Sequence, residues 1–210
     1  MTGRLNVGIN TVSVSSLCMN IEILLFDGFD ELDAIAPYEV FQLASQECQI
    51  GVQLVTLESV KQVKARNGLS VVPDGTIAED QDLLLIPGGG WNDPSVAGVR
   101  REYESGDIPR VISNRFHAGT TIASVCTGSF LLAKAGIIDT RPVTTHHTGH
   151  KDLQQMGFDV RDDRFIDDGQ ILTASGITSG FDLALHIVER YCNSDLSDSI
   201  AQELEYDTLK

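Results

Sequence analysis

The most chemically suggestive residue in the sequence is Cys126, in the segment Ser124-Val125-Cys126-Thr127-Gly128. β-Branched residues at 120–125 predict a strand, and residues 127–135 predict a helix that ends at Gly136. A nucleophile in such a sharp strand-to-helix turn is exposed by the bend and lies at a helix N-terminus. Nearby backbone N–H groups and the helix dipole stabilise negative charge, so we expect the pKa of Cys126 to lie below its usual value of about 8.5. The alternative is that Cys126 is a small buried core residue, as free cysteines often are.

A run of glycines follows a second predicted strand. Residues 82–86 are almost wholly apolar and lead into Pro87-Gly88-Gly89-Gly90. Glycines allow close backbone approach and leave N–H groups free to face an anion. We therefore expect Gly88 and Gly89 to line a pocket, with the Gly89 N–H polarising a reaction intermediate. The run is not G-x-G-x-x-G, so no dinucleotide cofactor is predicted.

Two more polar side chains lie near predicted strand ends. Asp33 ends a loop over residues 27–33, before a helix expected to open around Pro37. A carboxyl group buried against a thiolate has a raised pKa and can act as a general acid, although an aspartate at this position is more often a helix cap. His146 closes a strand predicted over 143–147. It could orient or deprotonate Cys126, or have only a structural role.

Strands and helices alternate along most of the chain. Further strands are expected at 21–26 and 52–57, hairpins at 64–71 and around 167–169, and helices at 94–104, 109–118, 149–156, 178–192 and 195–205. Several strands are apolar on both faces, which predicts a single α/β domain with a mostly parallel sheet covered by helices on both faces. Ligands bind at the carboxyl ends of the strands in such a sheet.

Four short motifs occur together in an arrangement that resembles the ThiJ/PfpI superfamily. They are Ile86-Pro87-Gly88-Gly89, the Cys126 turn, Thr144-Thr145-His146, and Ser175-Gly176-Ile177-Thr178-Ser179-Gly180-Phe181-Asp182. The resemblance covers residues 20–207. It implies a flavodoxin-like three-layer sandwich related to the glutamine amidotransferases, and a homodimer.

Within this superfamily the sequence is most similar to the isonitrile (isocyanide) hydratase branch. The similarity is carried by Cys-Thr-Gly-Ser at 126–129, Leu-Asp-x-x-x-Pro at 32–37 and Leu-Glu-Tyr-Asp at 204–207. In that branch the cysteine is the nucleophile, the aspartate is the acid/base, and the threonine after the cysteine is also required. The resemblance therefore implies that Cys126, Asp33 and Thr127 are catalytic and that Asp33 lies beside Cys126. Ala36 departs from the pattern, because many relatives have glycine before the proline.

The resemblance implies hydration of an isonitrile to an N-substituted formamide through a thioimidate on Cys126, with no cofactor. One alternative is a cofactor-free glyoxalase or deglycase, although such relatives usually have glutamate at the position of Asp33. A second alternative is a sensor or ligand-binding module related to the N-terminal domains of AraC-type regulators. Thr148 stands where an amidotransferase needs a carboxylate, and Thr127 where hydrolase relatives often have histidine. Both differences argue against an amidase or peptidase.

The amino-acid composition limits the kinds of molecule that this protein is expected to bind. The formal net charge of −15 argues against nucleic acid, which requires a basic face. No apolar run approaches the roughly 20 residues needed to span a bilayer, so no membrane association is predicted. The expected partner is a small-molecule substrate. The acidic residues are mainly aspartate, and lysine is scarce, a pattern that favours a salt-adapted protein over an ordinary acidic one.

The four cysteines, at 18, 48, 126 and 192, form no C-x-x-C pair and no Cys/His cluster with zinc-site spacing, so no metal site is predicted. Scattered thiols are more typical of a reducing cytoplasm than of a disulfide scaffold. Residues 1–18 are expected to form an N-terminal extension or to precede the true start, with one domain over residues 19–210.

Overall fold

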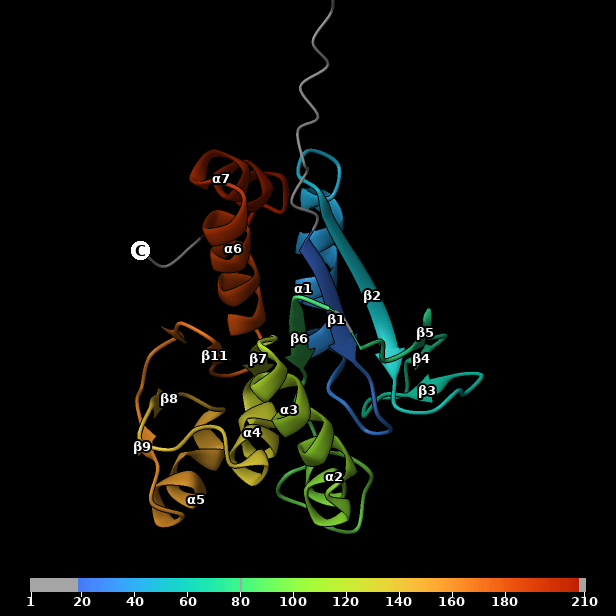
Figure 1. The fold of residues 1–210 in the computed structure, drawn as a ribbon, viewed down its shortest axis with the longest axis vertical. Helices are drawn as coiled ribbons and strands as arrows, with labels where there is room; N and C mark the ends of the chain where they lie inside the picture. Colours follow the sequence, from blue (N-terminus) through green and yellow to red (C-terminus); the bar gives the residue numbers. More distant parts are fainter. Residues whose placement is uncertain (1–18, 80, 208–210) are drawn as a thin grey trace, which may run out of the picture.

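A computed structural model describes residues 19–79 and 81–207. The expected extension over residues 1–18 therefore lies outside the described residues. Among the described residues, one sheet contains seven strands in the order β10-β11-β7-β6-β1-β2-β5. Figure 1 shows its central part, from β11 through β7, β6 and β1 to β2. All neighbouring strands are parallel except β10 and β11, which form an antiparallel hairpin. The strands of this sheet are β1 (Met19–Leu24), β2 (Ile50–Thr56), β5 (Gly75–Thr76), β6 (Leu83–Ile86), β7 (Thr121–Val125), β10 (Phe165–Asp168) and β11 (Ile171–Ala174).

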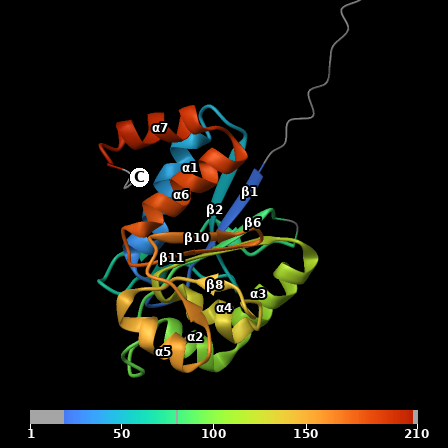
Figure 2. The ribbon, with the colours of Figure 1, turned by 90° about the vertical axis from the view of Figure 1, so that its left-hand side faces the viewer.

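Helices cover both faces of this sheet, which confirms the three-layer α/β prediction. Figure 2 shows α1, α6 and α7 on one side, and α2, α3, α4 and α5 on the other. The first group comprises α1 (Glu31–Ala44), α6 (Ser179–Tyr191) and α7 (Ser194–Glu203). The second comprises α2 (Val99–Ser105), α3 (Asp107–Ala118), α4 (Ser129–Ala135) and α5 (His150–Gln155).

Within the part of the chain that the structure describes, two small two-stranded sheets lie outside the main one. The predicted hairpin at 64–71 is confirmed as antiparallel β3 (Val63–Lys64) and β4 (Ser70–Val71). The second pair is β8 (Pro142–Val143) with β9 (Asp159–Val160), which are parallel. Among the described residues, no helix is both long and apolar enough to cross a membrane.

The central strands β6 and β7 are buried along their whole length, as their apolar sequences require. Their register pairs Leu85 with Ala123 and Ile86 with Ser124. Both strands are parallel and end at the same edge, so the glycine loop after β6 lies beside the Cys126 turn after β7. The sheet itself thus brings together two segments that are 38 residues apart.

Three elements differ from their expected bounds by more than two residues. Helix α1 begins at Glu31 rather than around Pro37, because Asp30 caps it by accepting a 3.3 Å hydrogen bond from the Leu32 N–H. Asp33 therefore lies in the first helical turn and not in a loop. The strand expected at 143–147 is limited to β8, and a short 3₁₀ helix, η2 (His147–Gly149), follows it. Helix α2 begins at Val99, five residues later than expected.

The expectation of unpaired thiols is wrong for two cysteines. Cys48 follows the C-terminus of α1 and Cys192 follows the C-terminus of α6, and the two form a disulfide with a Cα–Cα distance of 6.3 Å. Helices α1 and α6 pack side by side on the same face of the sheet, which places their ends together. The sequence contains no signal for this pairing, because the two cysteines are 144 residues apart.

Candidate active site

Cys126 occupies a strained turn between β7 and α4. Its φ of 60° is unusual for a residue with a side chain, and its N–H donates a 2.8 Å hydrogen bond to the carbonyl of Ser175. The carbonyl of Cys126 accepts a 2.9 Å hydrogen bond from Thr145 Oγ1. The next turn, η1 (Cys126–Gly128), has no room for a larger residue at Gly128, where an added Cβ would lie 2.4 Å from the Ile86 carbonyl oxygen. These contacts fix the predicted strand-to-helix turn.

The carboxyl group of Asp33 is the side-chain partner of Cys126. Asp33 is fully buried in the first turn of α1, and the two side chains interact directly. Its Oδ2 accepts a 2.9 Å hydrogen bond from the Gly88 N–H, whereas Oδ1 has no partner of normal geometry among the described residues. Burial, reinforced by the charge of Asp30, raises the pKa of Asp33 to about 8. Asp33 is therefore a carboxylic acid at neutral pH and holds a proton that it can give up.

The pKa expected for Cys126 is corrected by the structure. The thiol is almost completely buried, and this burial, together with the negative charge of Asp33, raises its pKa. A hydrogen bond from the Thr127 N–H opposes the shift but is the smaller effect. The sequence argument counted only the helix terminus and omitted the desolvation of the sulfur. Burial favours the neutral form of both side chains, and the charge of Asp33 further disfavours the thiolate, although a hydrogen bond from Cys126 opposes part of the rise in the pKa of Asp33.

Thr127 and Gly89 line the cavity as expected, whereas Gly88 is not among the lining residues and lies behind them, against Asp33. The Gly89 N–H donates a 2.9 Å hydrogen bond to Thr127 Oγ1, just as the Gly88 N–H donates to Asp33. The expectation that these N–H groups stay free for an anion is therefore not met. Instead, both groups hold side chains in place. Gly88 is tightly enclosed, since an added Cβ would lie 2.5 Å from the Thr127 nitrogen and 2.9 Å from Asp33 Oδ2.

His146 lies at the edge of the same cavity and does not bond to Cys126. Its Nδ1 is 2.9 Å from Thr148 Oγ1, so this ring nitrogen is occupied. Burial, with a contribution from neighbouring His147, lowers the pKa of His146, and the ring is neutral at pH 7. The nearby His150 bonds to the Thr145 carbonyl. Among the described residues, no three His, Cys, Asp or Glu side chains are placed to hold a metal ion.

Cys126 lies in the wall of a cavity of about 420 Å³. Beside Gly89, Cys126, Thr127 and His146, it is lined by Asp30, Arg66, Asn67, Gly90, Trp91, Asn92, Thr148 and Ile177. Asp33 lies behind this surface, in contact with Cys126. Arg66 and Asn67 come from the β3–β4 hairpin, which the sequence predicts. Its docking beside α1 could not be foreseen because that contact depends on the tertiary fold.

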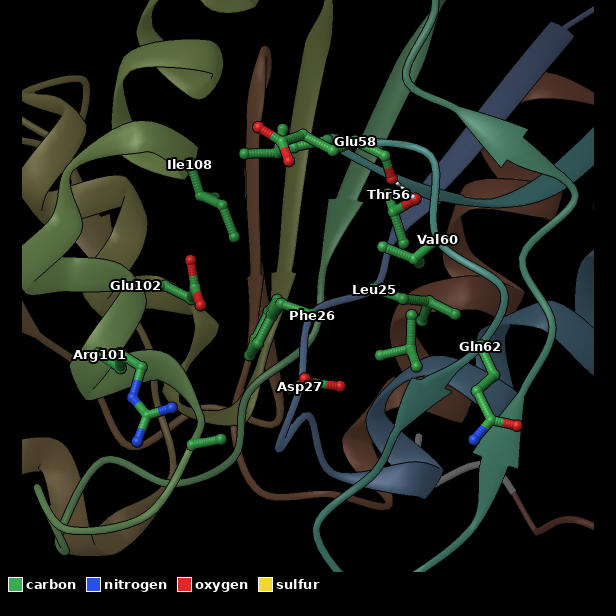
Figure 3. A pocket seen from close by; sticks show the side chains of 13 residues that line it. Leu25, Phe26, Asp27, Thr56, Glu58, Val60, Gln62, Arg101, Glu102 and Ile108 are labelled. Atoms are coloured by element: carbon green, nitrogen blue, oxygen red, sulfur yellow. Dashed lines mark hydrogen bonds between the residues drawn. The ribbon is translucent and has the colours of Figure 1, made fainter.

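A second, smaller cavity of about 270 Å³ lies at the carboxyl ends of β1 and β2. Figure 3 shows Phe26 at its centre, with Arg101 and Glu102 on one side and Val60 on the other. It contains no cysteine or histidine, whereas Cys126 and His146 both line the first cavity.

The sequence of this chain is similar to those of known proteins over most of its length. The family model for the DJ-1/PfpI family matches residues 19–190. The chain is 32% identical to an isonitrile hydratase of Pseudomonas putida over 90% of this chain and 79% of the relative. A glutathione-independent glyoxalase of Caenorhabditis elegans is 27% identical over 70% of this chain and 76% of that protein.

Two further matches concern a regulator and a solved structure. The HTH-type transcriptional regulator GbdR of Pseudomonas aeruginosa is 27% identical over 91% of this chain, which spans 52% of the regulator. The structure of Drosophila melanogaster DJ-1beta matches this fold with a TM-score of 0.78 at 22% sequence identity. The match covers 91% of this chain and 100% of the DJ-1beta chain. This structural match supports the flavodoxin-like sandwich inferred from the sequence.

Proposed function

The chain belongs to the DJ-1/PfpI family, and from this premise we propose that it hydrates isonitriles to N-substituted formamides, with Cys126 as nucleophile and Asp33 as general acid and base. The observation that carries the proposal is the direct contact of a buried, protonated carboxyl group with the thiol in the strained turn. The similarity to an isonitrile hydratase agrees with this assignment.

The first step forms a thioimidate. The sulfur of Cys126 attacks the terminal carbon of the isonitrile and forms a C–S bond. Asp33 passes its proton to that carbon and takes up the thiol proton, so one S–H bond is replaced by one C–H bond. The site stays neutral throughout, which suits a pair whose charged forms are disfavoured by burial.

The second step hydrolyses the thioimidate. Water attacks the same carbon while Asp33 takes a proton from the water and delivers one to the nitrogen. The tetrahedral intermediate then loses its hydroxyl proton to Asp33, which protonates the departing sulfur. The C–S bond breaks, the formamide leaves and the thiol of Cys126 is restored. One water molecule is consumed and no redox change occurs.

Thr127 is assigned the placement of that water. Its Oγ1 accepts a hydrogen bond from the Gly89 N–H. The hydroxyl proton of Thr127 is therefore available to donate a hydrogen bond into the cavity. Gly88 keeps Asp33 in register with the sulfur through the hydrogen bond to Oδ2.

The glyoxalase alternative uses the same cysteine, and the similarity to a glutathione-independent glyoxalase favours testing it. A peroxide sensor is less well supported, because reactive sensor thiols are exposed and have a low pKa, whereas Cys126 is buried and its pKa is raised.

Proton NMR of formamide formation from a simple alkyl isonitrile, with methylglyoxal assayed in parallel, separates the alternatives. We expect isonitrile turnover by the wild type, and a loss of about 10²-fold or more in Cys126→Ala and Asp33→Ala. Asp159→Asn, an exposed substitution, serves as the control. Wild-type turnover of methylglyoxal alone would replace the proposal with the glyoxalase, and full isonitrile activity in either site variant would refute the mechanism.

A further inference from the structure

Arg66, an exposed residue, adds a positive charge to the lining of the cavity that holds Cys126. It lies in the loop of the β3–β4 hairpin, and both residues line the cavity of about 420 Å³. Among residues 19–79 and 81–207, the Arg66 side chain has no hydrogen-bond partner and no ion pair. Asp30, Asp93 and His146 interact with it only through longer-range electrostatics.

The backbone of Arg66 is fixed relative to the catalytic pair. Its N–H donates a 2.9 Å hydrogen bond to the Phe29 carbonyl, just before α1. The next residue, Asn67, donates from its backbone and its side chain to the two carboxylate oxygens of Glu31, each at 2.7 Å. Glu31 lies in the same helical turn as Asp33. The hairpin is therefore clamped to the helix that carries Asp33, which keeps the Arg66 backbone beside the cavity.

Arg66 is the cation of this cavity at neutral pH. The other titratable lining groups are Asp30, which caps α1 through the Leu32 N–H, Cys126, whose pKa is raised by burial, and His146, whose lowered pKa keeps it neutral. Asp33, behind the surface, holds a proton. An unpaired guanidinium on a chain of net charge −15 presents an open fork of donors that matches a carboxylate in a bidentate arrangement.

We infer that Arg66 makes this site select isonitriles whose nitrogen substituent carries a carboxylate group. The reactive carbon would face Cys126 while the carboxylate binds the guanidinium at the hairpin side of the cavity. This inference rests on the proposed function, because it names the substrate class of that reaction.

The first test compares isocyanoacetate with its methyl ester, two isonitriles of similar size that differ in charge. In the wild type we expect the ratio of kcat/KM values to favour the carboxylate by about tenfold or more, the usual range for a hydrogen bond to a charged group. The ratio should fall toward one in Arg66→Gln and be partly retained in Arg66→Lys. Arg110→Gln, which removes an exposed arginine paired with Asp107, is the matched control. An unchanged ratio in Arg66→Gln would overturn the inference.

The second test does not require isonitrile turnover. Iodoacetate and iodoacetamide both alkylate a thiol, and they differ mainly in the carboxylate. We expect the iodoacetate-to-iodoacetamide rate ratio at Cys126, followed by peptide mass spectrometry, to be severalfold higher in the wild type than in Arg66→Gln. If this ratio shifts as expected while no isonitrile is hydrated, the proposed function fails and carboxylate recognition stands. If the ratio is equal in both proteins, the role of Arg66 is refuted whatever the reaction.

Discussion

The backbone N–H of Gly88 donates a 2.9 Å hydrogen bond to Oδ2 of Asp33, joining the loop after β6 to the first turn of α1. This contact holds the buried carboxyl group against Cys126. It also leaves the second carboxyl oxygen, Oδ1, without a partner of normal geometry among the described residues. The glycine loop thus positions Asp33, and through it the proposed pairing of Asp33 with Cys126.

A Gly88→Ala substitution should disable the site. The new methyl group would lie 2.5 Å from the Thr127 nitrogen and 2.9 Å from Asp33 Oδ2, so one of these atoms must move. We expect isonitrile hydration to fall by about 10²-fold, the cost typical of a displacement near 1 Å in a catalytic group. Gly75→Ala is the matched control, because an added Cβ there meets no atom within 4 Å. Equal activities of the two variants would show that the close packing at Gly88 is unimportant.

Asp33→Asn should stabilise the protein more at pH 8 than at pH 5. The pKa of Asp33 is raised to about 8 in the folded state, so folding retains a proton that the unfolded chain releases. The resulting stability is fully present below about pH 4 and is lost as pH rises toward 8. Asparagine does not titrate, so the variant does not lose stability in this way. For the wild type, the loss in the free energy of unfolding between pH 5 and pH 8 is at most about 4 kcal/mol. Thermal melts of both proteins across this range give the difference, and a pH-independent difference would contradict a raised pKa.

Replacing Thr127 with valine should destabilise the protein as well as reduce activity. The buried N–H of Gly89 would lose its acceptor, Thr127 Oγ1, at a cost of about 1–3 kcal/mol. Thr127→Ser keeps the hydroxyl group and should retain most of the stability. Urea denaturation measures both variants. Similar midpoints for valine and serine would mean that the hydroxyl group is not the acceptor that matters.

The Cys48–Cys192 disulfide should contribute to stability and not to chemistry. It links the ends of α1 and α6, and removing a native disulfide typically costs about 2–5 kcal/mol. A Cys48→Ser/Cys192→Ser double variant should therefore melt at a lower temperature than the oxidised wild type. Peptide mapping without reduction should recover the two peptides joined. Identical melts with and without reductant would show that the bond is not formed in solution.

The sequence predicted those parts of the fold that depend on local signals. The strand–turn–helix at Cys126 follows from β-branched residues before it and a helix-forming segment closed by Gly136. The hairpin at 64–71 follows from Asn67-Gly68, with Gly68 at a φ of 106°. The positions of Cys126 and the glycine loop at neighbouring strand ends follow from their places in a parallel sheet.

The remaining features depend on contacts between distant segments. Pro37 favours a helix start at its own position, whereas α1 begins six residues earlier, because Asp30 provides the cap. The occupied N–H groups of Gly88 and Gly89, and the raised pKa of Cys126, require knowledge of what surrounds each group. Docking of Asn67 on Glu31 likewise leaves no trace in the local sequence.

The most direct test of the account is the mass of the protein during turnover. When the wild type is mixed with an alkyl isonitrile and quenched in acid, intact mass spectrometry should reveal a species heavier by the mass of one isonitrile, located on Cys126 by peptide mapping. Asp33→Asn should accumulate neither this thioimidate nor the formamide product. Formamide production by the wild type with no adduct on Cys126 at any quench time, or undiminished turnover in Asp33→Asn, would contradict the central claim that these two side chains share the reaction.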